Sequence, residues 1–252
     1  KSAGCVILPG YHIIQQISET AHSLIYRAIR TKNRQPVILK TPKTVHPKTE
    51  VLIRYKQEFE IARRLSAAGV IPAYFLLPLH DSLILVLEDF GGESLSHWLE
   101  AWRSVGTTAF RLPKFLKLAS RLASELAGVH AAGVIHKNIN LSNIVFNPET
   151  EELRLIDFDH ATALSRETPL FKNPQVLEGT LAYLSPEQTG RMNRVVDYRS
   201  DLYSLGVTLY ELLTGHLPFQ SDDPLVLVHS HIAKTPPPVA ARNPSVPLIV
   251  SD

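Results

Sequence analysis

The chain has 252 residues, 44% of them hydrophobic and 20% charged, a balance that suits a buried core and excludes wholesale disorder and fibrous repeats. Its 26 basic and 24 acidic residues leave a net charge of +2, which gives no basis for a nucleic-acid-binding surface. The single cysteine, Cys5, excludes an intrachain disulfide and a multi-cysteine zinc site. The longest apolar runs are far shorter than the roughly 18 residues of a membrane span, and the first residues do not form a secretion signal. We therefore expect a cytoplasmic chain without a membrane segment.

The first third of the chain predicts strands. Residues 11–29 mix turn-like and β-branched residues, residues 36–40 form a short strand that ends in Lys40, and residues 83–87 are an unbroken apolar run of strand length. The region between the last two predicts one helix, because apolar or small residues recur at helical spacing at Val51, Tyr55, Ala62 and Leu65.

The signals at the ends of this first helix are also present in the sequence. Thr49 is a candidate N-cap, and Gly69 is expected to end the helix.

The rest of the chain predicts mostly helices. A stripe with spacings of three and four runs through residues 115–129 and is followed by Gly133 as a stop signal, and residues 202–213 form a more apolar helix typical of a domain interior. Two short β-like pieces, 143–146 and 153–156, lie between them. A strand-rich part followed by a helix-rich part is the α+β pattern.

Glu58 falls on the apolar stripe of the first predicted helix, whereas Glu60 falls on the solvated face with the basic residues. A carboxylate on a buried stripe needs a partner, because an unpaired buried charge is too costly. Lys40 is the obvious candidate. The alternative is that Glu58 reaches out to solvent.

Two polar segments follow the long helix. Residues 136–143, HKNINLSN, are rich in hydrogen-bonding amides and lie between short strands, as expected for a site loop on a rigid scaffold. Asp157, Phe158 and Asp159 close the next strand and place a carboxylate where Mg²⁺ could be held by oxygen ligands. The alternative is a pair of turns in which Asn and Asp only cap the backbone.

These features occur in the order of the protein-kinase signature set. The set has a lysine at a strand end (Lys40), a glutamate on the next helix (Glu58) and an H-x₆-N loop (His136 to Asn143). D-F-x (Asp157 to Phe158) and S-P-E (Ser185 to Glu187) follow. The segment 201–206 also resembles the aspartate-bearing start of the kinase's central buried helix. The resemblance extends from about Tyr11 to the end of the chain.

A narrower resemblance rests on the strings EDFGGESL at 88–95, GTLAYLSPEQTGRMNR at 179–194 and DYRSDLYSLGVTLYELLTGHLPF at 197–219. They look like the amino-terminal kinase-like domain of large bacterial, cyanobacterial-type hybrid Ser/Thr–histidine kinases with many sensor modules. Thr180, in a G-T-x-A-Y context, resembles Ser/Thr kinases more than tyrosine kinases.

The resemblance implies a bilobal kinase-like fold, with a β-rich lobe at 1–90 that ends in the hinge and a helical lobe at 91–252. Residues 246–252 look like the approach to a further helix, so we expect the carboxyl-terminal helices to be missing and the chain to be a fragment of a longer protein. Glu187 would pair with an arginine of that absent region.

The resemblance also implies ATP and Mg²⁺ as cofactors. Lys40 would hold the α- and β-phosphates, Glu58 would hold Lys40, and Asn143 and Asp157 would bind Mg²⁺. The residues that would contact the adenine are Ile17, Ile25, Ile38, Leu87 as gatekeeper, Glu88 to Phe90 through their backbone, and Val145. Because Ile38 replaces an alanine of the kinase pattern, the adenine slot is expected to be tight. His136 and Phe158 would have structural roles, as would Glu187 and Asp201.

Three departures from the kinase pattern predict activity that is weak or absent. The phosphate-covering loop, residues 18–23, contains no glycine, and Glu19 adds negative charge, so ATP affinity should fall. Asp159 replaces the glycine of D-F-G. It would either add a carboxylate near the metal or be a solvated surface residue. Asn138 stands where the catalytic aspartate belongs, and an amide cannot take a proton, which removes a contribution of about 10²–10⁴-fold.

Other polar residues have weaker implications. Thr162, Ser165 and Thr168 lie where an activating phosphate would go in a kinase, although hydroxyl residues are common in any loop. His229 and His231 are expected to be surface residues that point to different sides of a helix.

The sequence is compatible with two functions, and a third is less favoured. The first is a Ser/Thr protein-kinase domain with impaired catalysis that acts on protein substrates. The second is a pseudokinase that scaffolds or regulates other domains of the same longer chain. A small-molecule kinase of similar fold is disfavoured, because GTLAYLSPEQ resembles a protein-substrate docking loop.

Overall fold

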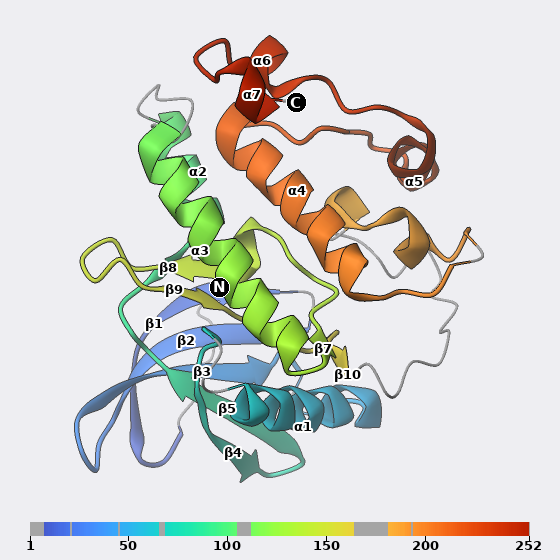
Figure 1. The fold of residues 1–252 in the computed structure, drawn as a ribbon. Helices are drawn as coiled ribbons and strands as arrows, with labels where there is room; N and C mark the ends of the chain where they lie inside the picture. The colour runs from blue at the N-terminus through green and yellow to red at the C-terminus, as the bar shows by residue number, and fades with distance from the viewer. Residues whose placement is uncertain are drawn as a thin grey trace. The chain divides into compact units, whose positions relative to one another are not determined.

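The computed structural model describes residues 8–20, 22–44, 46–65, 69–104, 112–163, 181–192 and 194–251. The chain divides into two compact units, residues 1–92 and 93–252. The first contains a sheet and one long helix, and the second is mostly helical with short strands (Figure 1). The predicted α+β class is therefore confirmed.

An antiparallel sheet with the strand order β1-β2-β3-β5-β4 forms the first unit. Its strands are β1 (Tyr11–Glu19), β2 (Ser23–Arg30), β3 (Gln35–Pro42), β4 (Ala73–Leu79) and β5 (Ser82–Glu88). Strand β4 was not predicted; it lies at an edge of the sheet and contains Pro78. Proline has no N–H to donate, and an edge position tolerates this loss.

One face of this sheet carries a hydrophobic core. The buried residues of the core come from the segment before β1 and from the three inner strands: Leu8, Tyr26, Ala28, Val37, Leu39, Ile84 and Val86. Because side chains alternate along a strand, the residues between them point to the opposite face. Ile38, Lys40, Leu85 and Leu87 occupy that second face and are also buried.

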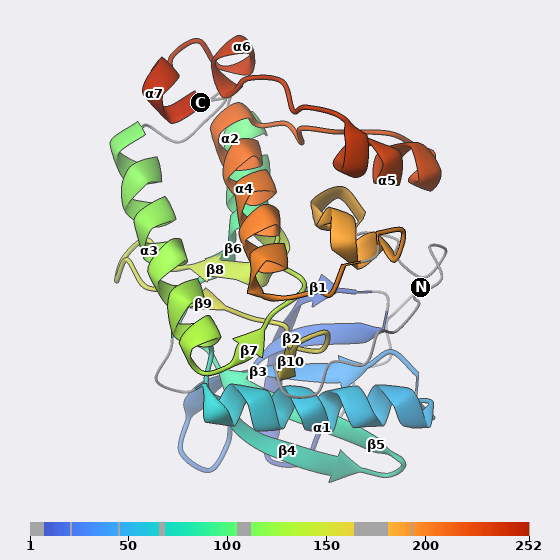
Figure 2. The same cartoon turned by 45° about the vertical axis from the view of Figure 1, so that its right-hand side comes forward.

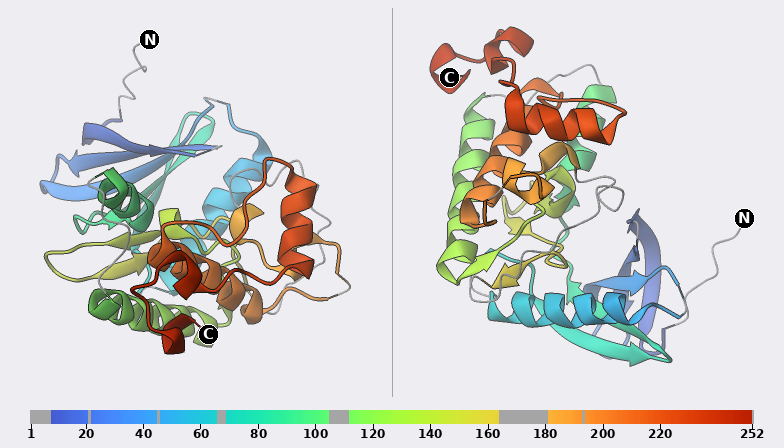
Figure 3. Two further views of the ribbon diagram at one scale, coloured as in Figure 1. Left: turned by 90° about the horizontal axis from the view of Figure 1, so that it is seen from above. Right: turned by 90° about the vertical axis from the view of Figure 1, so that its right-hand side faces the viewer.

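Helix α1 (Thr49–Arg64) packs against β4 and β5 (Figure 3). Its buried residues are Tyr55, Glu58 and Ala62, which confirms the predicted stripe. The expected helix ends were wrong. Lys48 is the N-cap residue, without a side-chain capping bond, so Thr49 is the first helical residue. The helix ends at Arg64, before Gly69, and the Leu65 N–H closes the last turn on the Ile61 carbonyl.

Short strands and helices make up the second unit. The strands are β6 (Glu93–Ser94), β8 (Ile144–Phe146) and β9 (Leu153–Leu155) in one sheet, and β7 (Val134–Ile135) and β10 (Thr162–Ala163) in another. The α-helices are α2 (Leu95–Ser104), α3 (Leu112–Ala131), α4 (Tyr198–Thr214), α5 (Pro224–Ala233), α6 (Val239–Arg242) and α7 (Leu248–Ser251). The described residues of this unit also form the 3₁₀ helices η1 (Leu141–Asn143), η4 (Leu181–Tyr183) and η5 (Pro186–Thr189). None of the helices in the described part of the chain is long and apolar enough to cross a bilayer.

Helices α3 and α4 lie alongside each other, with β7 packed against both (Figure 2). The whole apolar stripe of α3 is buried, and Gly133 follows at φ 71°, a left-handed conformation that favours glycine. Asp197 caps the start of α4 by accepting from the Arg199 N–H, and Gly215 ends it at φ 74°. Both predicted helices and the stop signal at Gly133 are therefore confirmed, although α4 begins at Tyr198, before the expected start at Leu202.

The expectation that both α5 histidines lie at the surface was wrong for one of them. His229 is exposed, but His231 is only 5% exposed. Its Nδ1 lies 2.8 Å from the Tyr203 hydroxyl, and its ring packs edge-on against Phe219. His231 lies one helical turn from Leu227 and Val228, which belong to a buried cluster with η4, so this face of α5 turns inward.

Candidate active site

A buried ion pair links the sheet and the helix of the first unit. The Lys40 Nζ lies 2.7 Å from the Glu58 Oε2, and the two side chains are 6% and 3% exposed. Glu60, two residues further along α1, is exposed. The pairing inferred from the apolar stripe is therefore present, and the alternative in which Glu58 reaches solvent is wrong.

Three of the residues expected at the adenine share the sheet face of Lys40. Ile25 pairs with Lys40 across β2 and β3, and Ile38 pairs with Leu87 across β3 and β5, so all four side chains leave the sheet on one side. Ile17 differs: it lies at a break in the β1–β2 register and is 41% exposed.

The remaining expected adenine contacts lie elsewhere. Glu88, the last residue of β5, and Phe90 are half-buried in the first unit. Val145 is a half-buried residue of β8 in the second unit.

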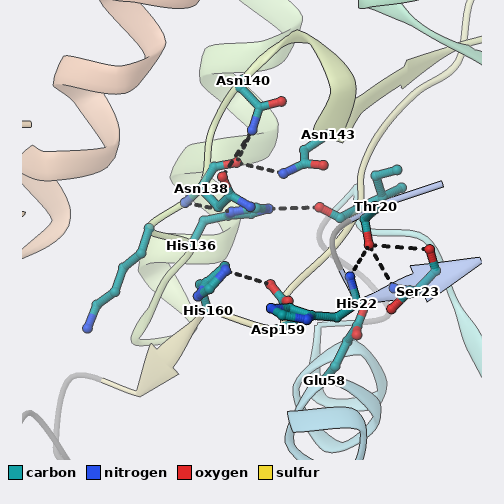
Figure 4. Close-up of polar contacts among 12 residues, drawn as sticks. Thr20, His22, Ser23, Glu58, His136, Asn138, Asn140, Asn143, Asp159 and His160 are labelled. Carbon is teal, nitrogen blue, oxygen red and sulfur yellow. Dashed lines mark hydrogen bonds and ion pairs between the residues drawn. The ribbon is translucent and has the colours of Figure 1, made fainter. Parts of the chain in front are cut away.

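The turn between β1 and β2 is held by its own polar groups. The Thr20 N–H donates to the Ser23 carbonyl at 2.9 Å, and the Ser23 N–H donates to the Thr20 Oγ1 at 3.0 Å (Figure 4). The Glu19 Oε1 lies 2.6 Å from the Lys43 Nζ in an ion pair. The hydrogen bond from Lys43 and its positive charge lower the pKa of Glu19. The negative charge that Glu19 was expected to add to this loop is therefore offset by Lys43.

An ion pair not foreseen from the sequence holds the segment after β5. The Arg27 Nε donates to the Asp89 Oδ2 at 2.8 Å, and an amino group of Arg27 donates to the Gly92 carbonyl at 3.3 Å. Asp89 in turn accepts from the Gly91 N–H at 3.0 Å. The signal available in the sequence was an acidic residue directly after a buried strand, with Phe90 and then two glycines behind it.

In the second unit, the polar loop 136–143 folds around Asn138. The Asn138 carbonyl accepts from the Asn143 Nδ2 at 2.9 Å and from the Asn140 Nδ2 at 3.0 Å (Figure 4). All three asparagines are less than 9% exposed. The loop is thus a buried network of amides. Backbone capping, the alternative reading, is also present, because the Asn140 side chain caps η1 by accepting from the Ser142 N–H.

Asp201 on α4 anchors the start of this loop. Its carboxylate is fully buried and accepts from the backbone N–H groups of His136 at 2.8 Å and Lys137 at 2.7 Å, and from the His130 Nε2 at 2.8 Å. Lys137 has φ 65°, a conformation that a non-glycine residue adopts at some energetic cost. Asp201 therefore holds the loop in a backbone conformation that it would not favour by itself.

The His136 ring has the structural position expected of it. Its Nε2 lies 3.0 Å from the Ile156 carbonyl and its Nδ1 lies 3.3 Å from the Asn138 N–H. Because a carbonyl only accepts and an N–H only donates, the ring is a neutral imidazole with the proton on Nε2. Burial lowers the pKa of His136, against the opposing effect of the Asp201 and Asp157 charges. The ring centroid lies 4.4 Å from that of Phe158.

Asn143 and Asp157 lie on adjacent segments. The Ile156 N–H donates to the Asn143 carbonyl at 3.0 Å, directly beyond the pairing of β8 with β9. Because the Asn143 Nδ2 is bound to Asn138, its Oδ1 faces the other side of the amide. Asp157 is half-buried at φ 66°. An amide oxygen and a carboxylate on neighbouring segments fit the oxygen ligands that Mg²⁺ prefers.

Asp159 is half-buried, and its Oδ1 lies 3.5 Å from the His160 Nε2. It does not have a positive φ, so this position does not require the glycine of the D-F-G pattern. A fully solvated Asp159 is therefore not what the structure shows.

The S-P-E segment is tied to the same loop. Ser185 is the N-cap residue of η5, and its N–H donates to the Gln188 Oε1 at 3.1 Å. The Gln188 Nε2 donates to the Lys137 carbonyl at 2.9 Å. Glu187 accepts from the Ser200 hydroxyl on α4.

Of the expected hydroxyl residues, only Thr162 falls within the described part of the chain. Thr180, Ser165 and Thr168 lie outside the described residues, and Thr162 is the first residue of β10.

With this geometry, the chain belongs to the protein kinase family: the family model described as the protein kinase domain matches residues 11–244. It is similar to serine/threonine protein kinases of bacteria. It is 31% identical over 234 residues, 91% of the chain, to the probable serine/threonine-protein kinase pknA2 of Bifidobacterium longum. It is 29% identical over 249 residues, 96% of the chain, to the serine/threonine-protein kinase pkn3 of Myxococcus xanthus.

The aligned part is a minority of each relative, 30% of the first and 44% of the second. A shorter match is closer in sequence. Over 73 residues, 29% of the chain, it is 62% identical to hybrid signal transduction histidine kinase G of Dictyostelium discoideum, of which this covers 2%. The predicted kinase resemblance is confirmed, and this match is consistent with its narrower form.

Proposed function

We propose that this chain is a serine/threonine protein-kinase domain that binds Mg-ATP in the cytoplasm and transfers the γ-phosphate to protein hydroxyls, with reduced turnover. The observation that carries the proposal is the buried ion pair between Lys40 and Glu58. Two buried charges are costly unless they are paired, and a hydrophobic pair of similar size is often as stable. A phosphate-binding role for Lys40 explains why the charges are there.

Asn143 and Asp157 would hold Mg²⁺, which supplies neutralisation of phosphate charge when it is bound. Because the Asn143 Nδ2 donates to the Asn138 carbonyl, the Asn143 Oδ1 faces away from that carbonyl. On the Lys40 face of the sheet, Ile25, Ile38 and Leu87 offer an apolar surface for the adenine, and the backbone after β5 would meet its edge. Ile17 and Val145 complete the proposed set.

Asn138 is the proposed reason for low turnover. An amide at the base position cannot receive the proton of a substrate hydroxyl. Because the transition state of phosphoryl transfer is loose, losing a base lowers the rate without abolishing the reaction. The loop 18–23 lacks glycines, so we also propose weak nucleotide binding, with the charge of Glu19 offset by Lys43.

A thermal-shift titration with Mg-ATP tests this function. Nucleotide that binds only the folded chain raises the melting temperature by mass action. We expect a rise that grows through millimolar Mg-ATP and that is much smaller with adenosine, which lacks phosphates. A folded chain whose melting temperature does not move with millimolar Mg-ATP would exclude the nucleotide site.

The second candidate is a pseudokinase that scaffolds or regulates other domains of a longer chain. Asn138 favours it, and so does the 62% identity over 73 residues to part of a hybrid signal transduction histidine kinase. Transfer of phosphate from labelled ATP by the wild type and by Asn138→Asp separates the two candidates. Transfer by either protein favours the kinase, and binding without transfer by both favours the scaffold.

A further inference from the structure

The side-chain amide of Asn140 is bonded at both of its ends. Its Oδ1 accepts from the Ser142 N–H at 2.9 Å. Its Nδ2 lies 3.0 Å from the carbonyl of Asn138 and 3.0 Å from the Oδ1 of the same residue (Figure 4). Asn140 and Asn138 are 7% and 8% exposed, so these bonds are sheltered from water.

The backbone fixes how the two amides are turned. The Ser142 N–H can only donate, so the oxygen of Asn140 must face it and the NH₂ group must face Asn138. The carbonyl of Asn138 can only accept, which agrees with that orientation. An NH₂ group then requires an acceptor on the side chain of residue 138, so the Oδ1 of Asn138 faces Asn140.

We propose that Asn140 is a positioning residue that holds the side-chain oxygen of residue 138. This inference rests on the proposed kinase function, in which residue 138 occupies the base position. In the wild type, the bond engages the oxygen that would otherwise accept from a substrate hydroxyl. In Asn138→Asp, the same NH₂ group binds one carboxylate oxygen and leaves the other to receive the proton.

The simpler role for Asn140 is to cap η1, which needs only its Oδ1. Serine also caps well through its hydroxyl, but it is too short to reach the side chain of residue 138 and has no amide. Asn140→Ser therefore keeps the cap and removes the positioning bond. Asn147→Ser is the matched control, because the Asn147 Oδ1 also caps a turn, by accepting from the Glu149 N–H.

The first test measures turnover in the Asn138→Asp background. We expect Asn140→Ser to lower kcat about 10-fold or more while KM for ATP stays within about twofold, because a loosely held base affects the transition state more than nucleotide binding. Asn147→Ser in the same background is expected to retain kcat. If Asn140→Ser also retains kcat while Asn138→Asp is active, Asn140 is only a cap and the inference is wrong.

The second test does not need activity. We expect both Nδ2 protons of Asn140 to exchange with water about tenfold or more slowly than those of the exposed Asn33, measured by NMR on asparagine-labelled protein. In Asn138→Ala one proton loses its acceptor and should exchange faster, while the proton bound to the carbonyl stays slow. Exchange that is unchanged in Asn138→Ala would overturn the inference. If the Asn140 protons exchange as expected but neither the wild type nor Asn138→Asp transfers phosphate, the kinase function is wrong and the positioning bond of Asn140 stands.

Discussion

The Lys40 Nζ and the Glu58 Oε2 lie 2.7 Å apart and join strand β3 to helix α1 across 18 residues of sequence. Both side chains are almost completely buried, and Lys40 also lies 5.7 Å from the centre of the Tyr55 ring. Removing one partner of such a pair leaves a buried charge without compensation, which typically costs about 3–5 kcal/mol, whereas removing both can cost little. The pair therefore offers a way to separate folding from nucleotide binding.

Lys40→Met is expected to weaken Mg-ATP binding by about 10-fold or more while the chain remains folded, because the ammonium group that would hold the phosphates is gone. It should also lower the free energy of unfolding, because Glu58 loses its partner. The double substitution Lys40→Met with Glu58→Gln should recover most of that stability without restoring binding. Urea unfolding and calorimetric titration with Mg-ATP measure the two effects.

Glu60 provides the matched control for Glu58, because it lies on the exposed side of the same helix. Glu60→Ala is expected to change stability and binding within about 0.5 kcal/mol. If Glu58→Ala and Glu60→Ala changed stability and Mg-ATP binding equally, the ion pair of Glu58 with Lys40 would contribute to neither.

Asp201→Asn is expected to lower the free energy of unfolding by about 3 kcal/mol or more. The carboxylate accepts from the two backbone N–H groups of His136 and Lys137 and from the His130 ring, and an amide would turn an NH₂ group toward at least one of these donors. Urea denaturation of both proteins measures the difference. Asp197→Asn is the control: asparagine caps a helix as well as aspartate does, so a comparable loss there would show that the effect is not specific to Asp201.

The pH dependence of stability should report the buried histidines. Burial lowers the pKa of His136 and of His231 below the ordinary value of 6.5, so the unfolded chain takes up protons at a pH where the folded chain does not. Stability is therefore fully present above about pH 6.5 and falls as the pH decreases, by at most about 1.4 kcal/mol per pH unit for each histidine.

Urea unfolding between pH 5 and pH 8 measures that slope. His136→Asn removes one titrating group, so its stability should fall less steeply below pH 6.5 than that of the wild type, whatever its absolute stability. The same substitution at the exposed His229 serves as the control. A slope that is identical in the wild type and in His136→Asn would contradict the neutral, buried ring at position 136.

Much of the fold could be predicted from local patterns. The apolar run 83–87 and the stripe of α3 correspond to a buried strand and a buried helix face, because burial is the main cause of both patterns. Glu58 could be found because a carboxylate on an apolar stripe needs a partner. Edge strand β4 was missed because it contains a proline, and its place in the sheet depends on pairing with β5.

The positions that sequence reasoning missed depend on contacts between distant segments. His231 lies in an almost continuously apolar helix, so its own sequence does not show that the cluster with η4 covers its face. Asn140 was read as part of a polar loop, because its role depends on which way two amides are turned. Asp89 was not foreseen as a partner of Arg27, since 62 residues separate them.

Asn138→Asp is expected to raise the turnover of phosphate transfer by up to about 10²–10⁴-fold, with little change in the affinity for Mg-ATP. The substitution hardly changes the size of the side chain, and the carbonyl that accepts from Asn140 and Asn143 belongs to the backbone and is kept. What it adds is a carboxylate that can receive the hydroxyl proton as the phosphoryl group moves. Initial rates with labelled ATP and a generic protein substrate, measured beside the wild type, give the ratio.

The matched control for this last substitution is Asn147→Asp, a change of the same chemistry at another buried asparagine of the same unit. It adds the same charge without placing a carboxylate at the base position, so turnover should stay at the wild-type level. An increase in both variants would show that added negative charge, and not proton acceptance at position 138, raises the rate. If Asn138→Asp binds Mg-ATP but transfers no phosphate to itself or to protein substrates, the impaired-kinase function fails and the scaffold function replaces it.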